Sequence, residues 1–156
     1  MTGVVRNLRF RIQPGSFAAR LLFLTSGGLA MDQHTFQLTT AMRLRRSQDF
    51  ERTYADGLRA GDGHLLVFAA PNEQPLTRAG LSVSRKHGSA VIRNRKRRLL
   101  REAFRLNQQR LPAGLDLILI PRFRADSTLH DYARSLVLLT RQLHSQISRK
   151  SEPPPF

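Results

Sequence analysis

One stretch near the middle of the chain decides its fold, and it reads Gly80-Leu-Ser-Val-Ser-Arg-Lys-His-Gly-Ser-Ala-Val-Ile-Arg-Asn-Arg-Lys-Arg-Arg-Leu-Leu-Arg-Glu-Ala-Phe104. Its first residues belong to a short run, Arg78–Ser84, whose composition predicts a strand. From Ala90 to Arg110 the spacing of apolar residues becomes helical, and Pro112 and Gly114 close that segment. The stretch therefore predicts a strand followed directly by a long helix.

The predicted helix is strongly basic. Between Arg85 and Arg110 the chain carries ten Lys or Arg and one acid, Glu102. This segment therefore supplies +9 of the formal net charge of +15. At 100° per residue the arginines form a ladder, and an apolar side lies elsewhere on the helix. The ladder comprises Arg93, Arg97, Arg101 and Arg105, with Asn94 and Arg98 beside it, and the apolar side comprises Ile92, Leu99, Ala103 and Leu106.

Such a ladder needs a compensating partner, because like charges four residues apart on a helix repel one another. The planar guanidinium donates two parallel hydrogen bonds to phosphate, which suits an RNA backbone better than a diffuse membrane surface. The alternative is a solvated amphipathic face, which a more mixed charge pattern would favour. The charge pattern therefore predicts a nucleic-acid partner.

The residues before this stretch predict a helix and another strand. Ser47 is placed as the N-cap of a helix that runs to about Asp56 and stops at Gly57. Phe50 and Tyr54 share one face of that helix, and they either pack inward or take part in binding. The run His64–Ala70 is predicted to pair antiparallel with Arg78–Ser84, across the turn residues 71–75.

After the basic helix, the apolar run Asp116–Ile120 predicts a strand buried on both faces and ended by Pro121. A last helix is predicted over Asp131–Ser148, where Leu136, Leu139 and Leu143 recur at helical spacing. These elements predict an α/β (α+β two-layer) domain with helices covering a small sheet.

The two ends are expected to lie outside this domain. Residues 1–41 show no sustained period and are interpreted as an N-terminal extension, either disordered or not native, with Met42 as a possible true start. The domain is placed at 42–148, and residues 149–156 form a C-terminal tail that is disordered by composition.

Composition excludes several classes of site. The chain has no cysteine, which excludes disulfides, thiolate zinc sites and Cys nucleophiles and favours a reducing compartment, the cytoplasm. The five histidines are too far apart for a metal-ligand motif, and no P-loop or run long enough to cross a membrane is present. No catalytic residue and no metal ligand is therefore predicted, and any role in catalysis rests on positioning and charge.

The stretch Gly80–Phe104 resembles the signature of the bacterial ribonuclease P protein subunit, in which an Arg-Asn-Arg helix follows a Gly-Leu-Ser-Val-Ser strand. Ser47–Gly57 is similar to that family's first helix, and Asp116–Pro121 to its last strand. The resemblance implies a mixed sheet covered by helices, like the second domain of ribosomal protein S5, with an unusual left-handed βαβ crossover.

The resemblance also implies a function, because in this family the protein assists a catalytic RNA that removes the 5′ leader from precursor tRNA. The protein alone is then inactive, Mg²⁺ is held mainly by the RNA, one protein joins one RNA, and no membrane is involved. Contacts to the catalytic RNA are implied for Arg93, Asn94, Arg95, Arg97, Arg98, Arg101 and Arg105. Contacts to the leader are implied for Phe50, Tyr54, Phe68, Ser82, Ser84, Arg85 and Lys86.

Two other classes stay open from the residues alone. A ribosomal or other structural RNA-binding protein would explain the basic helix but would show no preference for leader-bearing tRNA. An independent protein nuclease would need acidic metal ligands, which the sequence does not bring together in any recognisable pattern.

Overall fold

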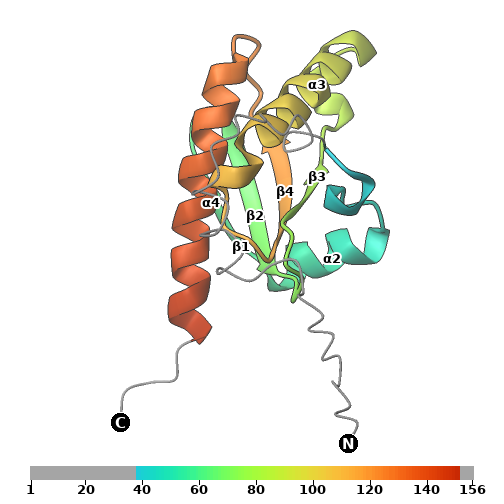
Figure 1. The fold of residues 1–156 in the computed structure, drawn as a ribbon. Coiled ribbons are helices and arrows are strands. Elements are labelled where there is room, and N and C mark those ends of the chain that lie inside the picture. The colour runs from blue at the N-terminus through green and yellow to red at the C-terminus, as the bar shows by residue number, and fades with distance from the viewer. Residues whose placement is uncertain (1–37, 152–156) are drawn as a thin grey trace, which may run out of the picture. The chain divides into compact units, whose positions relative to one another are not determined.

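A four-stranded mixed sheet forms the middle of the molecule, in the order β1-β2-β4-β3. The computed structural model describes residues 38–151, and the predictions for residues 1–37 and 152–156 lie outside it. The strands are β1 (Leu58–Gly61), β2 (Leu65–Pro71), β3 (Arg78–Leu81) and β4 (Leu115–Pro121). Three α-helices accompany them, namely α2 (Ser47–Asp56), α3 (Ala90–Asn107) and α4 (Leu129–Ser151) (Figure 1).

Strand β4 lies between β2 and β3, so the predicted antiparallel pairing of those two strands is wrong. β2 pairs antiparallel with β4, and β3 pairs with β4 in parallel. The physical reason is the apolar character of β4, which is buried from Leu115 to Leu119 and needs a neighbour on each side. After β2 the chain stays paired with the β4 segment instead of closing a hairpin with β3, since the backbone N–H of Asn72 donates to the Gly114 carbonyl.

The hydrophobic core lies on one face of the sheet, under α3 and α4. Alternate strand residues such as Leu65, Val67, Leu117 and Leu119 are fully buried there, against Phe104 of α3 and several residues of α4. The α4 residues are Tyr132, Leu136, Val137, Leu139 and Leu143. Partly buried Leu38 and Met42 pack against the same core. The predicted class, a small mixed sheet covered by helices, is confirmed, and β3, α3 and β4 form its βαβ unit.

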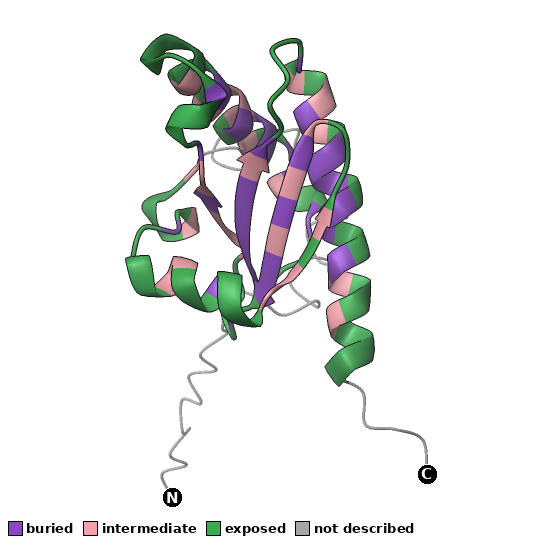
Figure 2. Cartoon of the chain, turned by 180° about the vertical axis from the view of Figure 1, so that it is seen from behind, coloured by how far each residue is buried: buried purple, intermediate pink, exposed green. Residues whose placement is uncertain are grey.

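The opposite face of the sheet is covered only in part. Helix α2 crosses one end of it, and in Figure 2 the strands beyond α2 lie open to view. Leu66, Phe68 and Ile120 point to this face and are only half-buried, whereas their neighbours along the strands are buried. Of the predicted leader residues, Phe68 lies on this face, and Phe50 and Tyr54 lie on α2, which covers part of it.

The helices depart from the predictions in detail. Helix α2 begins at Ser47, so the N-cap is Arg46 and not the predicted Ser47, and no side chain caps the helix. Just before it, Leu44 is buried and its backbone N–H donates to the Ala79 carbonyl. β1 was not predicted, since four residues with two glycines nearby carry too weak a pattern. Helix α4 begins at Leu129, two residues early, where the Asp131 carboxylate accepts from the backbone and hydroxyl of Thr128.

The apolar side predicted for the basic helix is also wrong in part. Ile92 and Leu106 of α3 are more than two-fifths exposed. The face that packs on the sheet and α4 consists of Lys96, Leu100, Ala103, Phe104 and Asn107. The spacing 96, 100, 103, 107 fits a helical period as well as the predicted apolar side does. Periodicity alone therefore allowed two different buried faces for this helix. Lys96 can belong to the buried face because its aliphatic chain packs in the core while its ammonium group reaches a polar partner.

Candidate RNA-binding surfaces

The outer face of α3 carries exposed cations without acidic partners. Arg95, Arg98 and Arg101 are exposed along this helix, beside exposed Asn94. Among residues 38–151, the ion pairs of the structure include none of these three arginines. Their guanidinium groups are therefore free to donate hydrogen bonds to an anionic partner.

The other predicted members of the ladder have partners within the protein. Arg97 is half-buried, and its guanidinium donates to the Val83 carbonyl at 3.1 Å and to the Asn94 side chain at 3.3 Å. Arg105 forms an ion pair with Glu102, and hydrogen bonding to Glu102 raises the pKa of Arg105. Arg93 is half-buried as well. The ladder is therefore not uniform, because Arg97 and Arg105 make contacts within the protein in addition to any contact with a ligand.

Lys96 belongs to the core side of α3. Its ammonium group donates to the Arg122 carbonyl at 3.1 Å, and burial lowers the pKa of this lysine. One of the ten cations counted in the basic segment is thus withdrawn from the surface. It ties α3 to the end of β4 instead.

An aromatic group joins α2 to the partly open sheet face. The rings of Tyr54 and Phe68 meet edge to face, with centroids 4.9 Å apart and planes at 75°. Phe50 lies against Gly80 of β3, where an added Cβ would come within 2.4 Å of the Phe50 ring. Glycine is required at that position because the ring approaches the backbone closely. Tyr54 stays 40% exposed, so this ring has a face available to a ligand.

The polar members of the predicted leader set lie where β3 ends. The Ser82 amide N–H continues the ladder by donating to the Leu119 carbonyl, and the Ser84 hydroxyl lies 3.2 Å from the His87 ring. Arg85 and Lys86 follow in an exposed 3-10 turn. The structure thus groups the three aromatic rings, with Phe50 against Gly80 of β3, and places the hydroxyls and cations farther along the chain, where β3 ends.

Two basic surfaces around a small mixed sheet agree with a specific family. The sequence pattern of the family described as Ribonuclease P matches residues 38–144, which include both surfaces. The chain belongs to the ribonuclease P protein family. Members of this family act in the maturation of the tRNA 5′ end, as the protein component of a ribonuclease that works with an RNA subunit.

Individual relatives support the same family. The chain is 40% identical over 119 residues to the ribonuclease P protein component of Oleidesulfovibrio alaskensis, covering 73% of this chain and 95% of that protein. It is 36% identical over 106 residues to that of Natranaerobius thermophilus, covering 67% and 92%. The solved RNase P protein of Staphylococcus aureus superposes with a TM-score of 0.57 at 31% identity, covering 69% and 96%.

In this ribonuclease P protein, a buried ion cluster holds α2 on the sheet. The fully buried carboxylate of Asp116, on β4, accepts two hydrogen bonds from Arg78 at 2.6 and 2.7 Å and one from Arg52 of α2 at 2.6 Å. Asn72 donates a fourth at 2.9 Å. Burial alone would raise the pKa of Asp116, but these hydrogen bonds and charges outweigh it and lower the pKa.

Sequence reasoning missed this cluster, although one signal was present. Asp116 begins an otherwise apolar strand, and a buried acid needs donors. Arg78 of β3 also forms an ion pair with Asp49 of α2 at 3.3 Å, which is a second link between this helix and the sheet. The cluster thereby holds α2, which carries Phe50 and Tyr54, on the sheet.

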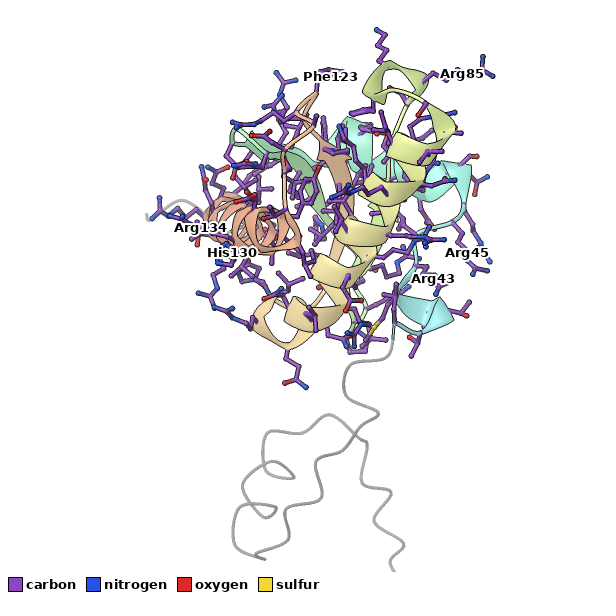
Figure 3. The ribbon with its side chains drawn as sticks, turned by 90° about the horizontal axis from the view of Figure 1, so that it is seen from above. Arg43, Arg45, Arg85, Phe123, His130 and Arg134 are labelled. Atoms are coloured by element: carbon purple, nitrogen blue, oxygen red, sulfur yellow. The ribbon has the colours of Figure 1, made fainter. Side chains whose placement is uncertain are left out.

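Arg43 and Arg45 are further surface residues that the sequence reasoning missed. They line a depression of about 330 Å³ together with Arg101 of α3, over a base that includes Leu44 and Phe104. Figure 3 shows both arginines beside α3, on the side away from α4. The available signal was the alternation Arg-Leu-Arg, in which the buried leucine turns both neighbours outward.

Residues 38–151 contain no group of three His, Cys, Asp or Glu side chains that could hold a metal ion. Two acidic residues beside the predicted surfaces, Asp116 and Glu102, are paired with arginines. The donor set of the described surface therefore does not fit a resident Mg²⁺, which prefers several oxygen ligands. No helix within the described residues is long and apolar enough to cross a membrane.

Proposed function

We propose that the protein binds the catalytic RNA of ribonuclease P through the outer face of α3 and the 5′ leader of precursor tRNA across the partly open sheet face. The first surface consists of Arg93, Asn94, Arg95, Arg97, Arg98, Arg101 and Arg105. The second consists of Phe50, Tyr54, Phe68, Ser82, Ser84, Arg85 and Lys86. The observation that carries the proposal is the chemical difference between these two surfaces, since the first is dominated by arginines and the second combines aromatic rings with cations.

The α3 surface suits a folded RNA backbone. Arg95, Arg98 and Arg101 are exposed and have no acid to neutralise them among the described residues. Phosphates would release counterions on binding such a surface, and the affinity would depend strongly on salt. Arg97 and Arg105 add charge at its borders while retaining their contacts with Val83 and Glu102. Arg43 and Arg45 extend the same surface beyond Arg101.

The sheet surface suits single-stranded RNA. Unpaired bases of any RNA sequence stack on aromatic rings, while Lys and Arg contact the phosphates. The exposed ring of Tyr54 and the half-buried ring of Phe68 offer the stacking group, and Arg85 and Lys86 supply charge at the end of β3. The 5′ leader is the single-stranded part of a precursor tRNA that remains for this surface once the folded tRNA is held elsewhere.

In this proposal the RNA subunit is the catalyst and holds Mg²⁺, and the protein alone is inactive. The described residues include no group of three His, Cys, Asp or Glu side chains that could hold a metal ion, and the chain has no cysteine. Their contribution is to position the leader and to screen phosphate repulsion. We place one protein on each RNA and the complex in the cytoplasm. The predicted binding domain, residues 42–148, is extended by Leu38, which packs against the core, and by the end of α4, which continues to Ser151 where a disordered tail was expected.

Precursor-tRNA cleavage by the cognate catalytic RNA tests the proposal. The assay is run at low Mg²⁺, with and without the protein, on substrates that carry or lack a leader of several nucleotides. We expect the protein to restore cleavage and to increase the affinity for leader-bearing substrate only. Cleavage by protein without RNA, after nuclease controls, would contradict the division of labour. Binding to the RNA without any effect on cleavage would favour a structural RNA-binding protein.

A further inference from the structure

An exposed phenylalanine lies on a stacked histidine just beyond the end of β4. The rings of Phe123 and His87 are nearly parallel, with centroids 4.6 Å apart and planes at 25°. His87 is buried, whereas Phe123 is 69% exposed. Single exposed apolar residues are ordinary on protein surfaces. Phe123 differs because one ring face is covered by a fixed partner and the other is left open.

Hydrogen bonds hold the buried ring of the stack, His87, in place. Nε2 of His87 lies 2.8 Å from the Pro121 carbonyl oxygen and donates to it. Nδ1 lies 3.2 Å from the hydroxyl of Ser84, which can donate to that nitrogen. His87 thereby joins the carboxyl ends of the parallel strands β3 and β4. The His87 ring is consequently fixed by hydrogen bonds, and it supports the Phe123 ring from one side.

Cationic residues adjoin both rings of the stack along the chain. Arg85 and Lys86 directly precede His87, are exposed, and form no ion pair among the described residues. Arg122 and Arg124 flank Phe123, although Arg122 donates to the Asp62 carbonyl and Arg124 pairs with Asp126. Figure 3 shows Phe123 and Arg85 projecting at the same end of the molecule. An aromatic face with cations around it is the arrangement that binds single-stranded nucleic acid.

We propose that the free face of Phe123 stacks on an unpaired base of the 5′ leader, beyond the base held at Tyr54. This inference rests on the leader assignment made above. The leader is favoured over the catalytic RNA because His87 contacts Ser84, and Ser84 continues the strand end that carries the proposed leader residues. Phe68 stands opposite Ile118, and Phe123 follows Ile118 by five residues, or about 16 Å of extended chain. A leader that runs along β4 would reach both rings at different nucleotides.

The test uses the assembled holoenzyme and precursor tRNAs whose leaders lengthen one nucleotide at a time. Wild-type affinity should rise at the length that reaches Tyr54 and rise again at a greater length. Phe123→Ala should remove only the second increment, on the order of five- to 100-fold. Phe123→Tyr should retain it and Phe123→Leu should lose it, because leucine preserves apolar bulk without a ring. An abasic nucleotide at that leader position should make wild type and Phe123→Ala equal.

A direct signal is available because the chain contains no tryptophan. Phe123→Trp creates a single indole whose fluorescence should be quenched by leader-bearing precursor and not by mature tRNA. Leu138→Trp, at a residue of α4 that is 56% exposed, is the matched control and should not respond. Quenching by the catalytic RNA alone would overturn the assignment to the leader.

The failure of this inference is distinguishable from failure of the proposed function. If wild type shows no increment with leader length, the leader assignment itself is wrong. If wild type shows both increments and Phe123→Ala keeps both, only the proposed role of Phe123 is wrong.

Discussion

Arginine has opposite roles in two regions of this molecule. Beneath α2, Arg52 and Arg78 converge on one buried carboxylate, and their charge is neutralised inside the protein. On the outer face of α3, Arg95 and Arg98 have no acidic partner among the described residues. The first region fixes the aromatic helix on the sheet, and the second leaves its charge for an anionic ligand. Net charge alone therefore overstates the binding surface, since some cations are consumed by the fold.

Removing the acid of the first region should have the largest effect. Asp116→Ala leaves the buried ends of Arg78, Arg52 and Asn72 without their acceptor, and we expect the free energy of unfolding to fall by about 3 kcal/mol. Urea denaturation measures this. Asp126→Ala, which removes a solvent-exposed pair with Arg124, is the control and should leave the midpoint unchanged. Equal midpoints for the two variants would mean that the cluster does not hold the fold.

The aromatic surface should show the next effect, on substrate and not on stability. Tyr54→Ala should weaken holoenzyme binding to leader-bearing precursor by about 1–3 kcal/mol, because a stacking face is lost. Binding to mature tRNA should be unchanged, and Tyr54→Phe should retain most of the affinity. Equal losses for both ligands would return the ring to a purely structural role beside Phe68.

Acid titration sharpens the comparison further. The folded pKa of Asp116 is lowered, so its stabilisation is complete above the unfolded value of about 4 and is lost as the pH falls through the folded pKa. The difference in unfolding free energy between wild type and Asp116→Asn should be constant near neutral pH. It should shrink below about pH 4, by up to about 1.4 kcal/mol per pH unit. A difference that grows on acidification would mean that burial dominates this carboxyl group.

The smallest expected effects are those of single arginines on α3. Arg98→Ala should reduce the slope of log affinity for the catalytic RNA against log salt by about one unit. Arg105→Ala should change it less, since Arg105 is already paired with Glu102. Arg134→Ala, an exposed position on α4 away from this surface, serves as the control (Figure 3). Equal slopes for Arg98→Ala and Arg134→Ala would place the RNA contact elsewhere.

Local signals were sufficient for most of the fold. The period change at Ala90 and the apolar run from Asp116 each placed an element correctly. Strand pairing was beyond such signals, because which strand occupies the centre depends on contacts between distant residues. The central position of β4 decides that pairing, and turn residues between β2 and β3 do not indicate that a third strand lies between them.

The candidate site divides in the same way. Charge density on a helix located the basic surface, since Arg95, Arg98 and Arg101 are indeed exposed. It could not tell that Lys96 turns inward, because a long aliphatic stem lets a cation occupy a core position. The Asp116 cluster and the His87–Phe123 stack join residues more than thirty positions apart, and only the folded chain brings them together.

Directed hydroxyl-radical probing tests most directly whether the two surfaces bind different RNAs. Because the chain has no cysteine, a single Arg98→Cys or Glu51→Cys change gives one tether for an iron chelate, on α3 or beside Tyr54 on α2. In the holoenzyme bound to precursor tRNA, we predict cuts in the catalytic RNA from position 98 and cuts in the leader from position 51. Leader cuts from position 98, with none from position 51, would contradict the assignment of the two surfaces.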